Sequence, residues 1–375
     1  MFHFLNLWRE SFAQDDMPDW KPPQFSKRQV SDAGKLLKEH HPAVSDQLLE
    51  AFRIAHNWRA SHIVPMRAMR AEMNAKVRRV GGDALTAARL KRMSSLRAKL
   101  RRAPHTLYQM QDIAGCRAIM PDQAAIDRLL ALYRSEAAHH LQGENDYISR
   151  PKASGYRSHH LIFRFQGVAE YEPWNRSPMF VEVQLRTRLQ HAWATAVEAV
   201  GMVRGEDLKS GVGDADWLRF FSLMAAEIAA REKSALVPGT PESDADRREE
   251  IVALERGLNA LASLEKYRQA VKISETASTG SPFFLIQFDP VNQYVRVRGV
   301  SLNASSHALD DAENNKLLNS VLVSVDKIAD LRSAYPNYFM DVRMFTDCLR
   351  RVVSPPPKAK FNIDEKWLSA WLGRG

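Results

Sequence analysis

Residues 181–187 (VEVQLRT) alternate apolar and polar side chains. Successive side chains of a β-strand point to opposite faces of the sheet, so this pattern predicts a strand with one buried face. The three apolar residues are expected to pack inward, and Glu182, Gln184 and Arg186 to share the other face. A carboxylate for magnesium and a guanidinium for phosphate on one face suit a nucleoside triphosphate site. An ordinary solvated sheet face is the alternative, because alternation alone reports only a half-buried strand.

The composition is that of a globular protein without membrane segments. The chain has 375 residues, 45% of them hydrophobic and 26% charged, and this length makes two domains the expectation. No apolar run reaches the about 18 residues of a membrane helix, and the N-terminus lacks the features of a signal peptide. Two cysteines are too few for a disulfide framework or a cysteine zinc site. We therefore expect a cytoplasmic location and no membrane partner.

Positive charge is concentrated in one segment. Residues 51–102 hold 14 Lys or Arg against two acids, Glu72 and Asp83, a local net charge of +12 in a chain of net charge +9. Such a concentration attracts polyanions, either nucleotides or an RNA end. A basic but merely solvated helix face is the alternative.

The predicted fold class is α/β (α+β): a mixed β-sheet flanked by helices, with a smaller C-terminal α+β domain. Residues 1–30 are expected to be a loosely ordered lead-in, 31–235 the first domain, 236–250 a linker and 251–375 the second domain. Helical spacing over 31–103 is broken at Gly81–Gly82. The other predicted helices are 123–139, 187–200, 217–233, 251–272, 326–334 and 344–353. The predicted strands are 113–120, 156–165, 180–185, 283–289, 294–300 and 321–325.

Three upstream segments add polar groups that suit phosphate chemistry. Residues 89–99 (RLKRMSSLRAK) are predicted to form a helix whose cations neutralise triphosphate charge. Asp112 precedes a strand, where an aspartate is commonly a turn residue. Together with Glu182 it would give a two-carboxylate magnesium site that borrows oxygens from substrate phosphates.

The third segment is residues 155–160 (GYRSHH). Tyr156, Ser158 and His160 are expected to share one strand face, where they offer an aromatic ring, a hydroxyl and an imidazole.

In this order, the four segments resemble the synthetase domain of the RelA/SpoT-type alarmone synthetases, which are ATP:nucleotide pyrophosphotransferases. The resemblance covers about residues 50–235 and implies a nucleotidyltransferase-like domain of the single-synthetase branch. The matching motifs are Arg-x-Lys…Lys (Arg89, Lys91, Lys99), Asp-x-x-Gly-x-Arg (Asp112, Gly115, Arg117), Gly-Tyr-x-Ser-x-His (Tyr156, Ser158, His160) and Glu-x-Gln-Leu-Arg-Thr (Glu182, Gln184, Arg186, Thr187).

The resemblance implies a role for each matched residue. Asp112 and Glu182 would be the catalytic carboxylates and the Mg²⁺ ligands. The ATP donor would be bound by Arg89, Lys91, Lys99 and Arg117. The acceptor and phosphates would be placed by Tyr156, which stacks on the purine, and by Ser158, His160, Gln184 and Arg186. The reaction would move the β,γ-pyrophosphate of ATP to the 3′-hydroxyl of GDP or GTP and release AMP.

Two departures from the family pattern stand out. No His-Asp dipeptide occurs, so the hydrolase activity of the longer family members is not expected. The family often has a second arginine that stacks on adenine about thirteen residues beyond the strand aspartate. Position 125 is alanine here, and Arg128 is the nearest substitute.

Two other functions stay open. The first is a toxin that places pyrophosphate on the 3′ end of tRNA and blocks translation, with an antitoxin as partner; the basic segment makes tRNA a plausible acceptor. The second is a non-catalytic nucleotide-binding module. The C-terminal region carries no functional motif, and a sensor, a built-in inhibitor or a domain for homo-oligomer formation are all compatible with it.

Overall fold

The computed structural model describes residues 22–41, 43–168, 171–270, 272–276, 283–289, 292, 294–300, 319–325, 328–339 and 341–354. The α-helices are α2 (Lys27–Lys38), α3 (Asp46–Ala60), α4 (Ile63–Val80), α5 (Met93–Arg102), α6 (Gln123–Glu136), α7 (Glu172–Asn175), α8 (Arg188–Arg204), α9 (Ala215–Arg231), α10 (Asp244–Leu258), α11 (Ala260–Ala270), α13 (Ile328–Ala334) and α14 (Arg343–Val353). Short 3₁₀ turns are η2 (Leu107–Gln109), η4 (Leu208–Ser210) and η5 (Pro336–Phe339). None of these helices combines the length and apolar character needed to cross a membrane.

The described strands form one nine-stranded sheet in the order β3-β4-β5-β2-β1-β9-β7-β8-β6. They are β1 (Leu85–Leu90), β2 (Ala114–Met120), β3 (His140–Asp146), β4 (His159–Arg164), β5 (Phe180–Thr187), β6 (Lys272–Thr276), β7 (Phe283–Asp289), β8 (Tyr294–Val300) and β9 (Asn319–Ser324). β2 pairs with β5, and β6 with β8, in parallel, whereas β1 and β2 are antiparallel. The predicted mixed sheet flanked by helices is therefore confirmed.

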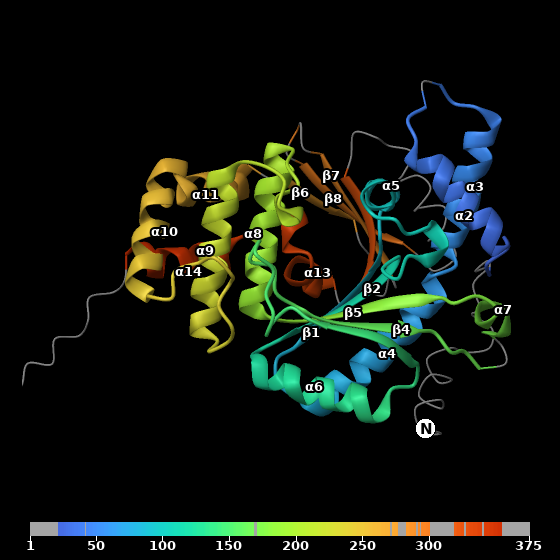
Figure 1. Ribbon diagram of the computed structural model, residues 1–375, viewed down its shortest axis with the longest axis horizontal. Helices are drawn as coiled ribbons and strands as arrows, with labels where there is room; N and C mark the ends of the chain where they lie inside the picture. The colour runs from blue at the N-terminus through green and yellow to red at the C-terminus, as the bar shows by residue number, and fades with distance from the viewer. Residues whose placement is uncertain are drawn as a thin grey trace, which may run out of the picture.

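The two faces of the sheet are covered differently. Helices α4 and α6 lie below it in Figure 1, and α8 and α13 lie on the opposite side. The predicted alternation in β5 is confirmed, because Val181, Val183 and Leu185 are fully buried in the core that α4 and α6 cover. Glu182 and Gln184 face the other way and are half-buried.

The sequence prediction was wrong for residues 85–90, which form β1 and not a helix. Gly81 and Gly82 have positive φ angles of 74° and 85°, which glycine adopts without strain, and they end α4 and lead the chain into β1. Arg89 therefore lies on a strand and Lys91 just beyond it, and only Lys99 of that motif is helical. The predicted helix 251–272 is also divided, at Asn259 with φ 49°. β3 was not predicted.

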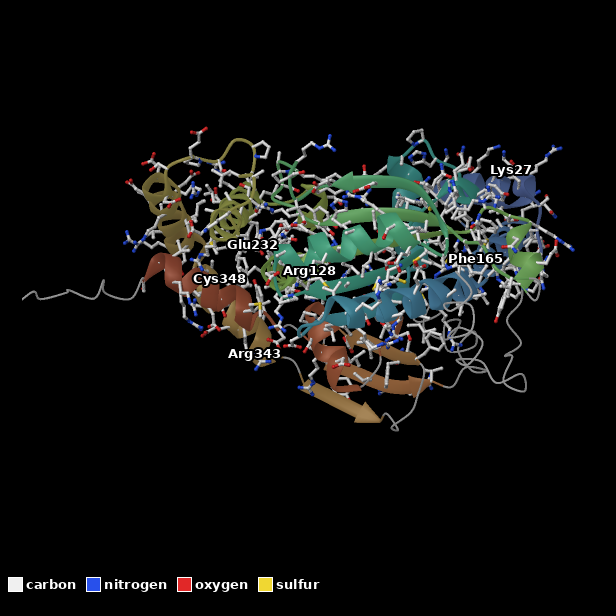
Figure 2. All side chains as sticks on the ribbon, turned by 90° about the horizontal axis from the view of Figure 1, so that it is seen from below. Lys27, Arg128, Phe165, Glu232, Arg343 and Cys348 are labelled. Atoms are coloured by element: carbon white, nitrogen blue, oxygen red, sulfur yellow. The ribbon has the colours of Figure 1, made fainter. Side chains whose placement is uncertain are left out.

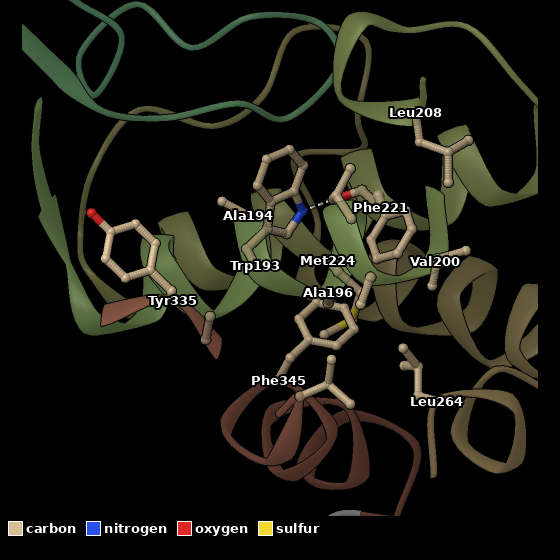
Figure 3. Close-up of a cluster of buried hydrophobic side chains, with 14 of the residues drawn as sticks. Trp193, Ala194, Ala196, Val200, Leu208, Phe221, Met224, Leu264, Tyr335 and Phe345 are labelled. Carbon is tan, nitrogen blue, oxygen red and sulfur yellow. Dashed lines mark hydrogen bonds between the residues drawn. The ribbon is translucent and has the colours of Figure 1, made fainter. Parts of the chain in front are cut away.

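The C-terminal elements continue the same sheet and the same core. β9 pairs with β1 at Ala88↔Ser324 and Arg89↔Val323. Figure 3 shows Phe345 of α14 packed among side chains of α8 and α9, including Trp193 and Met224. α10 starts at Asp244, inside the predicted linker. Division into two independently folding domains stays a prediction.

Two buried histidines make stability depend on pH. Burial lowers the pKa of His62 and of His139 to about 4, although the ring of His62 bonds the Trp58 carbonyl at 2.7 Å. In the unfolded chain each would bind a proton near pH 6.5. Between pH 6.5 and 4 the unfolded state thus holds more protons, so the stability that is present above pH 6.5 is lost as pH falls.

We expect the free energy of unfolding to drop by about 3 kcal/mol per histidine across this range. Urea unfolding at pH 7, 6, 5 and 4 would measure the drop. His62→Gln should remove up to one proton from the difference in bound protons between the unfolded and folded states. The same experiment measures this difference as the slope of the unfolding free energy against pH. An identical pH dependence in that variant would contradict this assignment.

Candidate functional site

A cleft of about 880 Å³ opens on the sheet face away from α4 and α6. It lies between α5 on one side and α8 with η4 on the other. Its charged lining consists of Arg89, Lys91, Arg92, Lys99, Arg102, Arg117, Lys152, Lys209, Asp112, Glu182, Glu198, Glu206 and Asp207. The excess of cations in a partly enclosed space suits a phosphorylated ligand.

Three residues that lie side by side on neighbouring strands form the centre of the cleft. Arg89 of β1 pairs with Gly115 of β2, and Gly115 pairs with Glu182 of β5. Since Gly115 has no side chain, a small pocket of about 60 Å³ stays open between the guanidinium and the carboxylate. Asp112, just before β2, lines the same pocket.

Asp112 is held by two lysines. The Nζ atoms of Lys91 and Lys99 both lie 2.8 Å from its Oδ2. Burial alone would raise the pKa of Asp112, but the two lysine charges outweigh it and lower that pKa. The other oxygen, Oδ1, is buried and has no hydrogen-bond partner among the described residues. This oxygen is therefore available to a cation.

Glu182 belongs to a closed ring of hydrogen bonds. His160 Nδ1 lies 2.8 Å from Glu182 Oε1, and His160 Nε2 lies 2.8 Å from the Tyr156 hydroxyl. Gln184 donates to Glu182 Oε2 at 2.5 Å. Arg186 closes the ring by donating to Gln184 Oε1 at 3.1 Å and to the Tyr156 hydroxyl at 2.6 Å. The ring fixes the orientation of the Glu182 carboxylate.

The ring also sets the charges at the site. Burial raises the pKa of Glu182, but the hydrogen bond and charge of His160, with help from Gln184 and Lys91, lower it to about 2. Burial likewise raises the pKa of Tyr156, but the charges of Arg186, His160 and Lys209 lower it to about 7. Glu182 is therefore an anion at neutral pH.

The structure brings most of the predicted site residues to this cleft. Those that line it are Arg89, Lys91, Lys99, Asp112, Arg117, Tyr156, His160, Glu182 and Gln184. Ser158 and Arg186 do not line it. The Ser158 hydroxyl is buried and donates to the Leu185 carbonyl at 3.2 Å, and Arg186 is 1% exposed within the hydrogen-bonded ring.

Arg128 lies elsewhere. It is an exposed residue of α6, the helix that covers the opposite face of the sheet (Figure 2). The apolar residues of α6, such as Ala125 and Leu129, hold the helix in that position. The placement therefore gives no support to Arg128 as a substitute for the missing adenine-stacking arginine.

Sequence reasoning missed several residues of the cleft. Glu198 is the only charged residue in the apolar stretch 192–203, a signal that could have marked it as a buried and paired charge. Burial raises the pKa of Glu198, but its ion pair with Lys209 and the Arg117 charge lower it below its usual value. Tyr335 and Tyr338 reach the cleft from the C-terminal region, and no local sequence signal indicates this.

Asp112 and Glu182 fit a magnesium ion. Among the described residues no three His, Cys, Asp or Glu side chains gather as a complete ligand set. Mg²⁺ is commonly held by one or two carboxylates and takes its other oxygens from phosphates and water. The unpartnered Asp112 Oδ1 and the ionised Glu182 are oxygen ligands of this kind.

The loop before β4 depends on Gly155. Its φ of +89° is left-handed, and a Cβ there would lie 2.7 Å from Ala225 Cβ and 2.9 Å from Trp193 Cζ2. We expect Gly155→Ala to lower the free energy of unfolding by about 2–4 kcal/mol. In α10, Gly257 has open space around it, so Gly257→Ala is the control and should raise stability by up to about 1 kcal/mol. Thermal unfolding of both variants would measure the change in stability. Equal shifts of the melting temperature in the two variants would contradict a steric clash at Gly155.

Residues 88–201 match the family described as "Region found in RelA / SpoT proteins". This stretch runs from β1 into α8 and contains Arg89, Lys91, Asp112 and Glu182. Residues 88–201 are thus a RelA/SpoT-type region, and the resemblance drawn from the motifs is confirmed for that part of the chain.

The chain is similar to GTP pyrophosphokinase YjbM of Bacillus subtilis (strain 168), with 33% identity over 114 residues, or 28% of this chain and 51% of the relative. It therefore spans about half the length of this curated relative. Two solved structures are also similar. The small alarmone synthetase 2 from Bacillus subtilis is 22% identical, with a TM-score of 0.39 over 47% of this chain and 91% of that one.

The small alarmone synthetase 1 from Bacillus subtilis bound to its product pppGpp is 25% identical. Its TM-score is 0.36 over 46% of this chain and 91% of that one. Both TM-scores lie below 0.5.

Proposed function

We propose that this protein transfers the β,γ-pyrophosphate of ATP to the 3′-hydroxyl of GDP or GTP. The observation that carries the proposal is the arrangement of Asp112 and Glu182 in one cation-lined cleft, inside the region that matches RelA/SpoT proteins. Similarity to a GTP pyrophosphokinase supports a guanine nucleotide as the acceptor.

On the donor side, cations compensate the charge of the transferred group. Arg89 and Arg117 lie on neighbouring strands at the floor of the cleft, and Lys91 and Lys99 lie beside Asp112. Pyrophosphate transfer needs in-line positioning and charge neutralisation more than covalent chemistry, and fixed cations supply both. Mg²⁺, when bound by Asp112 and Glu182, would add further neutralisation at the phosphate oxygens.

On the acceptor side, the hydrogen-bonded ring positions Glu182. His160 and Gln184 each hold one of its oxygens, so the carboxylate points in a fixed direction. The low pKa of Glu182 keeps it ionised and able to accept a hydrogen bond from the attacking hydroxyl. Any coordination of a metal by Glu182 competes with that role.

The basic segment is used in two ways, and this favours a small polyanion over tRNA. Arg89, Lys91, Arg92, Lys99 and Arg102 line the cleft. Other cations of the basic segment bind backbone carbonyls. Lys76 contacts the last turn of α6, and Arg97 and Arg101 bind the end of α2. Part of the +12 charge therefore stabilises the fold by bonding to the ends of helices.

The test is a transfer assay with γ-phosphate-labelled ATP and Mg²⁺. Purified protein is offered GDP, GTP or deacylated tRNA in parallel. Label on a guanine nucleotide is the expected result. Label on tRNA would establish the toxin alternative, and no transfer to any acceptor would contradict the proposed activity. An antitoxin partner and a homo-oligomer stay predictions.

A further inference from the structure

A second cavity, of about 1100 Å³, lies beside the start of β1 and the end of β2. Leu85 and Ile119, which pair across these two strands, line it together with residues from the start of α8 and from α13 and α14. Figure 2 shows two of the lining residues, Arg343 and Cys348 of α14. Among the described residues, this cavity and the cleft have no lining residue in common. We propose that the second cavity is a separate binding site for a nucleoside monophosphate with an amino group on its base.

The apolar part of the cavity suits the base. It comes from two helices: Leu189 and Ala192 of α8, and Val342, Met344 and Phe345 at the start of α14. Met344 is 45% exposed, so part of this apolar surface is open to a ligand. Small-molecule sites are mostly apolar, with a few polar groups that fix the orientation, and have volumes of about 300–1,000 Å³. The cavity is therefore large enough for a whole nucleotide.

His191 of α8 lines the same cavity and offers a hydrogen-bond acceptor. Its Nε2 lies 3.2 Å from the Ser333 carbonyl, which can only accept, so Nε2 carries the proton and Nδ1 has the lone pair. The side chain is 7% exposed, and Nδ1 has no hydrogen-bond partner among the described residues. Burial and the charges of Arg117 and Arg186 hold the pKa of His191 well below its usual value, so the ring is neutral. An amino group on the base could satisfy this buried acceptor.

Two unpaired arginines suit the phosphate. Arg78 in the last turn of α4 and Arg351 in the last turn of α14 line the cavity and are exposed. Neither makes an ion pair or a hydrogen bond within the part of the chain that the structure describes. The lining arginines Arg188 and Arg343, in contrast, are paired with Asp83 and Asp341, respectively. A phosphate is the ligand group that would complete the unpaired guanidinium groups.

The wall between the second cavity and the cleft is α13 with η5. Pro336 lines the second cavity, whereas Tyr335 and Tyr338 line the cleft. The carbonyl of Ala334, in the same stretch, accepts a hydrogen bond at 3.5 Å from Arg117, which lines the cleft. A nucleotide in the second cavity would thus contact the segment that places two tyrosines in the cleft. We therefore expect occupation of the second cavity to alter the rate of the proposed transfer.

Calorimetric titration of the full-length protein with CMP would test the inference. CMP has an amino group on its base and is neither substrate nor product of the proposed transfer. GDP, Mg²⁺ and a non-hydrolysable ATP analogue are kept at saturating concentration to occupy the cleft. CMP should bind under these conditions, and cytidine, which lacks the phosphate, should bind at least about tenfold more weakly.

Variants locate the binding. Arg78→Ala and Arg351→Ala should each raise the Kd for CMP by about five- to tenfold. His191→Gln keeps an N–H group for the Ser333 carbonyl but loses the Nδ1 acceptor, and should raise the Kd by about fivefold. The control is Arg128→Ala, which removes an exposed arginine of α6 outside both linings and should stay within about twofold of the wild type. The two lining arginines are exposed, so thermal unfolding of their variants should match that of the wild type.

A wild type that binds no CMP would overturn the inference, as would a Kd that is unchanged in both Arg78→Ala and Arg351→Ala. The transfer assay on the same proteins separates these outcomes from failure of the proposed function. A wild type that binds CMP but transfers no label contradicts the activity and supports the second site. In an active wild type, CMP should change the transfer rate at least about twofold, and this change should be absent in Arg351→Ala. An active wild type whose rate CMP does not change contradicts the coupling through α13 and η5.

Discussion

Replacing Glu182 by glutamine is expected to lower pyrophosphate transfer by about 100- to 1,000-fold. The side chain keeps its size, so the fold should stay intact. What is lost is the negative charge that His160 and Lys91 maintain by lowering the pKa of Glu182 to about 2. Without this charge the site has one carboxylate left for a metal and no anion to accept a hydrogen bond from the attacking hydroxyl. Asp112→Asn should have an effect of similar size, because Lys91 and Lys99 would lose their shared anion.

The matched control is Glu136→Gln, which also neutralises one carboxylate. Glu136 lies at the end of α6 and pairs with Arg79 at the surface. Exposed ion pairs contribute at most about 1 kcal/mol, so this variant should transfer at the rate of the wild type. Initial rates with labelled ATP, together with thermal unfolding, would be measured for all three variants. Near-normal turnover in Glu182→Gln would remove this residue from the proposed chemistry.

Local patterns predicted the centre of the site well. Alternation in residues 181–187 placed Glu182 and Gln184 on one face, because a strand leaves no other arrangement when its apolar residues are buried. The same reasoning could not distinguish an accessible side chain from a covered one. Tyr156 and Arg186 are buried by residues far away in the chain, including Lys209 of η4.

The misassigned β1 has a related cause. Residues 85–90 (LTAARL) contain two alanines, two leucines and an arginine, which all favour helices, so their local preference is for a helix. Pairing with β2 on one side and β9 on the other overrides this preference. The β9 partner comes more than 200 residues later, so the signal for the strand is not local. Tyr335 and Tyr338 enter the cleft through the same distant segment.

Ending the chain at residue 235 is expected to leave a protein that does not fold. β9 covers the edge of β1 at Arg89, the residue that lines the centre of the cleft. Phe345 of α14 packs against Phe220 and Phe221 of α9, with ring centroids 6.3 and 5.7 Å apart (Figure 3 shows Phe221 and Phe345). Each large apolar side chain that loses its cover costs about 1.5–3 kcal/mol, whereas whole domains are stable by about 5–15 kcal/mol.

Circular dichroism melting would compare residues 1–235 with a chain that ends at residue 354, just after α14. The longer protein should unfold cooperatively, and the shorter one should show no cooperative transition. A cooperative transition in residues 1–235 would instead support the predicted division near 236–250. The shared core then would be an interface between two independent domains. If the shorter protein does not fold, truncation cannot show whether the C-terminal region restrains the cleft, because it removes the fold as well. That restraint is then tested by the transfer activity of the full-length chain with Tyr335→Ala or Tyr338→Ala.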